Sequence, residues 1–224
     1  MTVIDAPIIS DLEATFLENA SVEVSMSQAQ YMKNLFPFFG IQKPKRAELQ
    51  RSIFKSYPIQ NEDELLAIID YLWTKAEREY HYAACDLGEK YLKLCSQKAL
   101  KTFEAMIRVK SWWDTVDKIA SNLFGLVLLK YPQSLDHWIQ DPCLWIRRTI
   151  LIYQLRYKEK TNKEKLFEYC EKLMHEKEFF IQKAIGWALR EYSKTNPQDV
   201  KAFIMKNKPK LSSLSFKEGI RLIK

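Results

Sequence analysis

An aromatic residue recurs along the chain at nearly constant intervals, and this repeat constrains the fold more than any other feature. The spacings are 32, 33 and 35 residues, between Tyr80, Trp112, Trp145 and Phe180. Small or apolar residues follow each of them four positions later, namely Ala84, Val116, Thr149 and Ala184. Small residues allow paired helices to approach closely, and a period in this range is typical of two-helix solenoid units. The sequence therefore predicts an all-α chain of HEAT-like helical repeats.

The apolar pattern agrees with a helical chain. Apolar residues recur mostly at positions i, i+3, i+4 and i+7, the chain has five glycines, and no sustained alternation with a period of two is present. We expect a single domain over residues 1–224, folded as an α-α superhelix. In such stacks the second helix of each pair tends to line a concave inner face, so side chains at matching offsets converge on one surface.

The charge of the chain is unevenly distributed. Residues 1–110 contain 14 Lys and Arg against 15 Asp and Glu, whereas residues 111–224 contain 21 against 13. A one-sided basic field suits an anionic polymer, because Lys and Arg displace the counterions condensed on phosphates. A solvated basic surface without such a partner explains the charge equally well.

Several classes of protein are disfavoured. No apolar stretch approaches the length needed to cross a bilayer, and the N-terminus lacks the pattern of a secretory signal, so we expect a soluble, cytoplasmic protein. The cysteines and histidines show no ligand-like spacing, so no metal site and no disulfide framework is expected. Their positions are Cys85, Cys95, Cys143, Cys170, His81, His137 and His175.

The stretch "KSWWDTVDKI" (110–119) contains adjacent tryptophans and two carboxylates. Neighbouring helical positions point about 100° apart, so Trp112 and Trp113 cannot both enter the same core. Ser111 and Asp114 have the spacing of a capping box. Asp117 shares a face with Trp113 and stands where the other repeats have Cys or Ile, which indicates a functional site because local rules most often fail there. The alternative is a surface carboxylate paired with a Lys or Arg.

The segment "EFFIQKAIGWALREY" (178–192) has a second stripe beside its apolar one. Lys183, Trp187 and Arg190 recur at i, i+4 and i+7, an order that suits a sugar-phosphate backbone. Gly186 costs about 1 kcal/mol relative to alanine in a helix, which indicates that something approaches the backbone there. Alternatively, Trp187 is half-buried packing and Gly186 accommodates a neighbouring helix.

In "DPCLWIRRTILIYQLRYK" (141–158), Arg148 shares a helical face with Trp145 and Ile152. A guanidinium directed from an apolar surface could hold a phosphate through two hydrogen bonds. An ion pair to a neighbouring repeat is an equally good explanation.

Four segments closely resemble the alkylpurine DNA glycosylases of the AlkD type. They are "YMKNLFPFFGIQKPKR" (31–46), "SWWDTVD" (111–117), "WIRR" (145–148) and "FFIQKAIGWALREYSKTNP" (179–197). The resemblance covers roughly residues 25–224, and the N-terminal extension 1–24 matches poorly. It implies a bowl of HEAT-like helix pairs that binds duplex DNA in a basic concave groove. It also implies removal of N3- and N7-alkylated purines by a monomer, without a cofactor.

The resemblance assigns roles to individual residues. The catalytic carboxylate of the family falls on Asp117, its two sugar-facing tryptophans on Trp113 and Trp187, and the arginine associated with the site on Arg148. Lys43 replaces a small hydroxyl residue of the family. The residues implied as DNA-backbone contacts are Tyr31, Gln42, Lys43, Lys183 and Arg190.

These residue types fit the implied reaction. A purine alkylated at N3 or N7 carries positive charge and leaves as a neutral base, so the carboxylate is needed for the cationic sugar rather than for the base. The resemblance further implies that no base-flipping pocket is used, unlike in most glycosylases. Two alternatives stay open: a non-catalytic HEAT-repeat scaffold that binds DNA, and a helical adaptor for an acidic protein.

Overall fold

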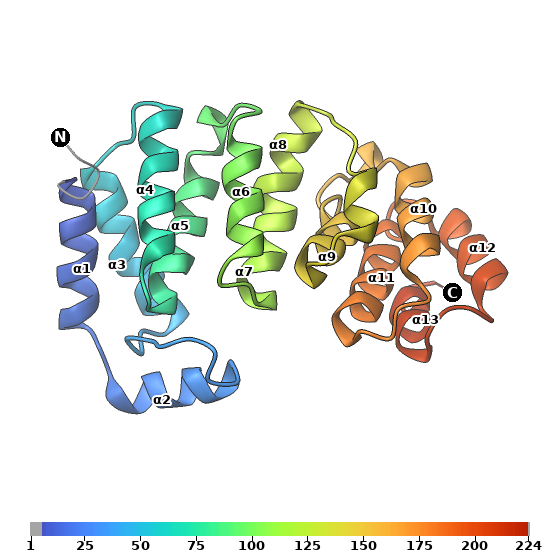
Figure 1. The fold of residues 1–224 in the computed structure, drawn as a ribbon, viewed down its shortest axis with the longest axis horizontal. Helices are drawn as coiled ribbons and strands as arrows, with labels where there is room; N and C mark the ends of the chain where they lie inside the picture. The colour runs from blue at the N-terminus through green and yellow to red at the C-terminus, as the bar shows by residue number, and fades with distance from the viewer. Residues whose placement is uncertain (1–5, 224) are drawn as a thin grey trace. The chain divides into compact units, whose positions relative to one another are not determined.

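The computed structural model describes residues 6–223, and within that range the chain is built from helices and loops without a β-strand. The all-α prediction is confirmed (Figure 1). The contacts divide the chain into two compact units, one ending at Thr102 and the other beginning at Phe103. The expected single domain and the expected concave surface stay predictions. No helix in the described range is long and apolar enough to span a membrane.

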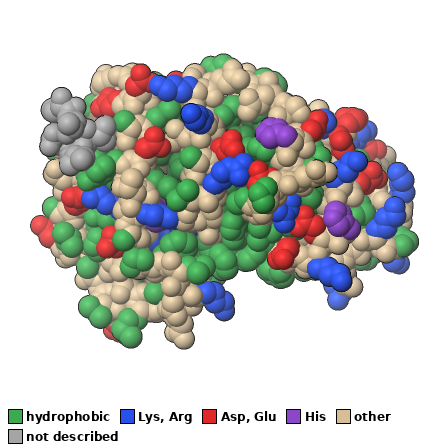
Figure 2. Space-filling view, viewed as in Figure 1, with side chains coloured by type: hydrophobic (Ala, Val, Ile, Leu, Met, Phe, Trp, Pro, Cys, Tyr) green, Lys and Arg blue, Asp and Glu red, His purple; other side chains and the backbone are tan. Residues whose placement is uncertain are grey.

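Charges of both signs are intermixed on one face of the molecule, drawn in Figure 2. On the face shown in Figure 2, Lys and Arg side chains alternate with Asp and Glu and form no continuous basic patch. Ion pairs also join residues of opposite charge within the C-terminal unit. Lys163 contacts Asp199 at 2.8 Å, and Arg147 contacts Glu176 at 2.8 Å. The basic excess of this unit is therefore partly neutralised by neighbouring carboxylates.

The described part of the N-terminal unit contains five complete α-helices, the beginning of a sixth and a short 3-10 turn at Leu92–Leu94. The α-helices are α1 (Pro7–Glu18), α2 (Val22–Tyr31), α3 (Lys43–Ser56), α4 (Glu62–Thr74), α5 (Arg78–Lys90) and α6 (Ala99–Arg108), which crosses the boundary. Figure 1 shows α2 lying across the ends of its neighbours in this unit. None of the residues of α2 is buried, and Val22, Met26 and Tyr31 are exposed.

A buried glutamate organises the connection between α2 and α3. Glu79 of α5 is 0% exposed, and its carboxylate accepts hydrogen bonds from the backbone N–H groups of Phe39, Gly40 and Ile41, at 3.1, 3.0 and 3.1 Å. Gly40 has a φ of +89°, and a Cβ atom there would lie 2.1 Å from the carbonyl oxygen of Ser21. The loop therefore needs both the carboxylate, which satisfies its donors, and a residue without a side chain.

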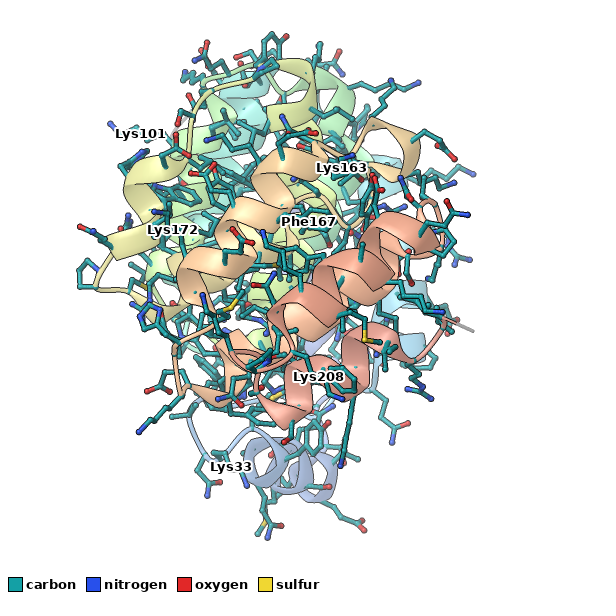
Figure 3. The ribbon with its side chains drawn as sticks, turned by 90° about the vertical axis from the view of Figure 1, so that its right-hand side faces the viewer. Lys33, Lys101, Lys163, Phe167, Lys172 and Lys208 are labelled. Atoms are coloured by element: carbon teal, nitrogen blue, oxygen red, sulfur yellow. The ribbon has the colours of Figure 1, made fainter. Side chains whose placement is uncertain are left out.

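The C-terminal unit continues with shorter helices. They are α7 (Trp113–Lys118), a π-helical segment (Ile119–Phe124), α8 (Gly125–Lys130), α9 (Leu144–Ile152), α10 (Lys163–Leu173), α11 (Phe179–Tyr192), α12 (Pro197–Asn207) and α13 (Ser213–Ile220), with short 3-10 turns at Asp136–Gln140 and Lys158–Lys160. Phe167 of α10, labelled in Figure 3, stacks on Phe203 of α12 with ring centroids 4.3 Å apart. An aromatic contact thus joins α10 to α12.

The predicted repeat register agrees with the burial of its members. Val116, Thr149 and Ala184 are each 0% exposed, as is Ala84 in the N-terminal unit. At these offsets the small and apolar side chains are therefore packed inside their units.

The predicted capping box at Ser111 is wrong. The residue that caps α7 is Trp112, which makes no side-chain capping bond, and the Ser111 hydroxyl donates to the carbonyl oxygen of Ile107 at 2.5 Å. Lys110 has a φ of +55°, and this reversal of the chain directs Ser111 back to the end of α6. Spacing alone could not anticipate a left-handed residue between the two helices.

The close approach predicted at Gly186 is made by a neighbouring helix. A Cβ atom on Gly186 would lie 2.5 Å from Cβ of Glu218 and 3.1 Å from the carbonyl oxygen of Ser215, both in α13. Of the two explanations considered from the sequence, packing of a helix is the one that the structure supports.

Replacing Gly186 with alanine should lower the free energy of unfolding by about 1–3 kcal/mol, because α13 must move to admit the new methyl group. Urea unfolding followed by circular dichroism measures the change. The control is Lys194→Ala. Lys194 is exposed and follows the end of α11 by two residues, so its replacement should change stability by less than about 0.5 kcal/mol. Equal stabilities for Gly186→Ala and the wild type would contradict this packing.

Candidate functional site

Asp117 occupies a position that the other repeats bury. The equivalent residues Cys85, Ile150 and Ile185 are each 1% exposed, whereas the Asp117 side chain is 18% exposed and lies in the last turn of α7. A carboxylate at the edge of a core requires hydrogen-bond partners, since an unpaired charge there would be strongly destabilising. Asp117, unlike the apolar residues at the same position in the other repeats, therefore needs a hydrogen-bond partner.

That partner is Arg148 of α9. Its Nε donates to Asp117 Oδ1 at 2.7 Å and its Nη2 donates to Oδ2 at 2.8 Å, so the guanidinium and the carboxylate form a two-point pair. The third nitrogen, Nη1, donates to the carbonyl oxygen of Phe180 at the start of α11, at 2.5 Å. Arg148 is 3% exposed. One arginine thus ties three successive repeats together and fixes the orientation of Asp117.

The two members of the pair differ in their exposure to solvent. The arginine is buried beneath the carboxylate, whose side chain is the more exposed of the two, at 18% against 3%. Burial raises the pKa of Asp117 above its ordinary value, while the bonds from Arg148 and its positive charge oppose this rise. Arginine has no acceptor, so both hydrogen bonds require an acceptor oxygen on Asp117 and favour its ionised form.

The structure distinguishes between the explanations offered for Arg148. Its side chain points inward to Asp117 and Phe180 rather than outward to solvent, so the ion pair to a neighbouring repeat is the correct explanation and direct phosphate binding is not supported. For Asp117, the ion pair expected as the alternative is also present. This ion pair leaves the carboxylate able to accept further hydrogen bonds, because each oxygen keeps a second acceptor site.

Trp113 and Trp187 lie on separate helices of the same unit. Trp113 is the first residue of α7 and precedes Asp117 by four positions, so the two share a face of that helix. Trp187 lies in the middle of α11, beside the close contact at Gly186. Both indoles are partly exposed.

An aromatic cluster lies beside the ion pair, and the sequence did not assign it a role. The rings of Trp112, Trp145 and Phe180 meet with centroids 4.9–5.5 Å apart, and the Arg148 guanidinium lies 5.8 Å from the centre of the Phe180 ring. These residues are the aromatic members of the repeat register. The signal was therefore visible in the sequence as periodicity, although contact between the rings was not.

The backbone after Asp117 departs from the α-helix. The segment Ile119–Phe124 is π-helical, and the Ser121 hydroxyl donates to the carbonyl oxygen of Asp117 at 2.8 Å. Such local expansions of a helix are frequent at functional sites because they re-aim the preceding side chains.

The two cationic residues predicted on α11 share one partner. Lys183 Nζ contacts Glu218 Oε1 at 2.5 Å, and Arg190 Nη1 forms an ion pair with Glu218 Oε2. Their side chains are 38% and 21% exposed, so both keep part of their surface accessible to solvent. The sequence gave no indication of Glu218, because the residue lies 28 positions from Arg190.

The other predicted DNA contacts belong to the N-terminal unit. Tyr31 ends α2 and is 69% exposed, Gln42 is the N-cap residue of α3, and Lys43 is the first residue of that helix. All three lie on the surface of their unit.

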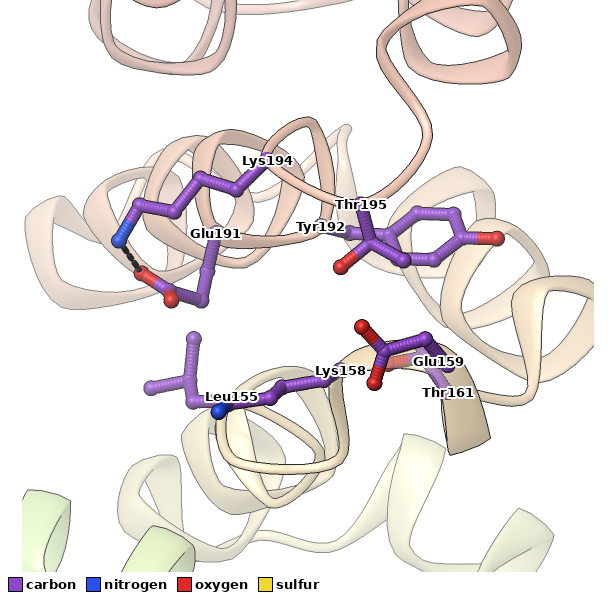
Figure 4. Close-up of a pocket in the computed structure, with 8 residues that line it drawn as sticks. All are labelled: Leu155, Lys158, Glu159, Thr161, Glu191, Tyr192, Lys194 and Thr195. Carbon is purple, nitrogen blue, oxygen red and sulfur yellow. Dashed lines mark hydrogen bonds and ion pairs between the residues drawn. The ribbon is translucent and has the colours of Figure 1, made fainter.

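Two pockets of the C-terminal unit are not lined by Asp117. Figure 4 shows one of about 210 Å³, lined by residues that include Lys158, Tyr192 and Lys194. Another, of about 410 Å³, lies beside Arg147 and His175. Neither is lined by Asp117 or by either tryptophan of the candidate site. The carboxylate is thus carried on a helix face outside both of these pockets.

Comparisons with known proteins agree on one family. A family model described as "DNA alkylation repair enzyme" matches residues 12–223. The chain is also similar to a solved structure described as "Predicted DNA alkylation repair enzyme from Enterococcus faecalis". The two are 35% identical, with 91% of this chain and 96% of that chain covered and a TM-score of 0.82. No curated protein matches the chain.

Replacing Arg148 with methionine should destabilise the protein by about 3–5 kcal/mol, because the buried side of Asp117 loses its partner. The double variant Asp117→Leu/Arg148→Met should recover most of this loss, since no unpaired charge remains. Chemical unfolding of the two variants and the wild type gives the comparison.

The single variant should also regain stability as pH falls through the raised folded-state pKa of Asp117 toward its ordinary value of 3.8. Without Arg148 the folded-state pKa of Asp117 lies further above its unfolded value, so the native state binds more protons and stability decreases as pH rises. A pH-independent deficit in Arg148→Met would count against a buried, unpaired carboxylate.

Proposed function

Because the chain belongs to the DNA alkylation repair enzyme family, we propose that it is a DNA glycosylase that hydrolyses the N-glycosidic bond of N3- and N7-alkylated purines in duplex DNA. The observation that carries the proposal is the two-point pair between Asp117 and Arg148, with the carboxylate toward solvent. The four residues Trp113, Asp117, Arg148 and Trp187 all belong to the C-terminal unit, so one chain acting as a monomer suffices.

The chemistry requires stabilisation of the sugar. An N3- or N7-alkylated purine is already cationic, and cleavage of its glycosidic bond releases a neutral base without a general acid. Positive charge then develops on C1′ and the ring oxygen of the deoxyribose. A carboxylate that is already oriented lowers the barrier because it meets this charge without reorganising.

Asp117 is suited to this role because its geometry is fixed before substrate binds. Arg148 occupies one acceptor site on each oxygen from below, at 2.7 and 2.8 Å, and leaves the outer sites for the sugar cation and the attacking water. In this proposal Arg148 is a positioning residue that touches Asp117 rather than the substrate. The buried guanidinium keeps the carboxylate ionised and facing outward.

The two tryptophans are proposed to hold the deoxyribose. Indole faces attract cations, and each contributes about 0.5–2 kcal/mol depending on how far the site is desolvated. Trp113 shares the face of α7 with Asp117, which makes it the nearer of the two along the chain. Trp187 would approach from α11, whose position is fixed by the contact of α13 at Gly186.

Selectivity in this proposal comes from the lesion rather than from a base pocket. The pockets of about 210 and 410 Å³ in the C-terminal unit are not lined by Asp117, which is consistent with this proposal. A cationic purine is a far better leaving group than a neutral base, so an enzyme that stabilises only the sugar cation discriminates through the intrinsic reactivity of its substrate.

Backbone contacts are proposed for residues of both units. Tyr31, Gln42 and Lys43 would serve in the N-terminal unit, and Lys183 and Arg190 in the C-terminal unit. The pairing of Lys183 and Arg190 with Glu218 leaves donors on both cations, because a lysine has three and an arginine five. Such contacts position the duplex without reading its sequence.

Asp117→Asn should reduce single-turnover release of 7-methylguanine from methylated duplex DNA by about 10²–10³-fold, because the amide cannot neutralise the sugar cation. Affinity for undamaged duplex should change little. Asp114→Asn, which removes a carboxylate from the same helix, is the matched control and should excise at nearly the wild-type rate. A wild-type protein that binds DNA but releases no base would instead identify a non-catalytic scaffold.

The same assay with different lesions tests the source of selectivity. Cationic 3-methyladenine and 7-methylguanine should be released, whereas neutral uracil should be retained, since its poor leaving-group ability is not compensated by a pocket or a general acid. The readout is base release by chromatography after incubation with equal enzyme concentrations. Uracil release at a rate comparable to that of 7-methylguanine would refute this mechanism.

Excision should decrease in acid as Asp117 becomes protonated. Burial raises the pKa of Asp117 above 3.8, the ordinary pKa of an aspartate. The pH at which half of the activity is lost should therefore also lie above 3.8. Activity depends on the ionised form, so it is retained above this pKa and declines below it. A pH profile of single-turnover rates, corrected for enzyme-free base release, gives the midpoint, and a profile without an acid limb would argue against a catalytic carboxylate.

A further inference from the structure

A second cluster of charged residues lies in the N-terminal unit, far in sequence from Asp117. A pocket of about 290 Å³ is formed between α3 and α5. Four cationic side chains line it together with one carboxylate and one amide: Lys43, Arg46, Arg51, Lys90, Asp86 and Gln50. This concentration of positive charge is notable because residues 1–110 as a whole contain more acidic than basic side chains, 15 against 14.

Arg46 sits in this pocket without a close acceptor. It is 7% exposed, and its nearest ion pair is to Asp86 Oδ2 at 3.9 Å, beyond hydrogen-bonding distance. Its Nε is buried and has no hydrogen-bond partner. The face of Tyr82, 4.3 Å from the guanidinium carbon, supplies a cation-π contact but no acceptor.

Arg46 differs from Arg148 in its hydrogen bonding. Both arginines are buried, yet Arg148 gives three hydrogen bonds to Asp117 and Phe180, whereas the guanidinium of Arg46 faces a pocket lined by other cations. Burial lowers the pKa of Arg46, which reflects an environment that disfavours its positive charge. An anion in the pocket would remove this penalty.

Gln50 adds a second donor without a partner. It lies on α3 one helical turn after Arg46, is 2% exposed, and its Nε2 is buried without a hydrogen bond. A buried amide donor left unsatisfied is destabilising by about 1–3 kcal/mol. Arg46 Nε and Gln50 Nε2 are thus two buried donors without acceptors, and both residues line the same cationic pocket. This arrangement indicates that the missing partner is an anion rather than a protein group.

We propose that the pocket between α3 and α5 binds a phosphate group, with Arg46 at its base and Lys43, Arg51 and Lys90 around it. Phosphate suits this arrangement because its oxygens accept several charge-assisted hydrogen bonds, and arginine holds it at two points. Lys90 already donates to the carbonyl oxygen of Phe54 at 2.6 Å, which holds its ammonium group at the pocket and leaves two donors. The site is independent of the glycosidic chemistry at Asp117, because it lies in the other unit.

Titration with inorganic phosphate tests the site directly. Isothermal titration calorimetry is performed on the full chain with chloride adjusted to keep ionic strength constant. The wild type should bind one phosphate per chain, and Arg46→Gln and Arg51→Gln should each weaken binding about tenfold or more. Arg51 is exposed, so its variant keeps the test valid if Arg46→Gln fails to fold.

Lys55→Gln is the matched control. Lys55 is an exposed cation at the end of α3 that does not line the pocket, and its replacement removes the same charge from the same helix. It should leave phosphate affinity unchanged. No saturable binding to the wild type, or an equal loss in all three variants, would overturn the proposal, since the second result indicates attraction to net charge alone.

A second arm of the experiment identifies the source of the phosphate. If the pocket receives the backbone of duplex DNA, inorganic phosphate will displace a fluorescent undamaged duplex and Arg46→Gln will weaken duplex binding. If it receives a free phosphate compound, phosphate will bind with unchanged affinity in the presence of saturating duplex. Both outcomes support a phosphate site, and neither depends on base excision by the protein.

Discussion

The pairing of a partly exposed carboxylate with a fully buried guanidinium is the interaction on which the C-terminal unit depends. Arg148 connects α7, α9 and the start of α11 through Asp117 and the carbonyl oxygen of Phe180. Such a pair contributes little net stability compared with apolar packing, while loss of one partner is strongly destabilising. The pair thus makes the orientation of Asp117 a consequence of folding, and an oriented carboxylate is what stabilisation of a sugar cation requires.

The repeat explains why this orientation is possible. Val116 and Thr149 are fully buried where neighbouring repeats pack, so the following position in each helix is held rigidly. In two repeats that position is filled by the apolar Ile150 and Ile185, whereas in one it is Asp117. Near the ion pair, the rings of Trp112, Trp145 and Phe180 form a continuous aromatic contact. A side chain carried by close-packed helices is held in a well-defined position, because the packing fixes the backbone that bears it.

The sequence predicted features that depend on local periodicity and missed those that depend on long-range partners. The helical class and the buried small residues follow from spacing, and the close approach at Gly186 follows from the cost of a glycine within a helix. The inward direction of Arg148 and the shared partner Glu218 do not, because they join residues about 30 positions apart in the chain. Ser111 was misjudged for a different reason, since the left-handed backbone at Lys110 has no signature in its residue type. The pocket around Arg46 was not predicted, because Asp86 and Lys90 reach it from α5, far from Arg46 in the sequence.

Recognition of charge at the sugar is the central claim, and binding of a transition-state mimic measures it most directly. Two undamaged duplexes are compared, one with a cationic pyrrolidine in place of a deoxyribose and one with a neutral tetrahydrofuran. The wild type should bind the cationic duplex at least about tenfold more tightly, and Asp117→Asn should bind the two equally. Equal affinities in the wild type, or a preference that survives in Asp117→Asn, would contradict the account.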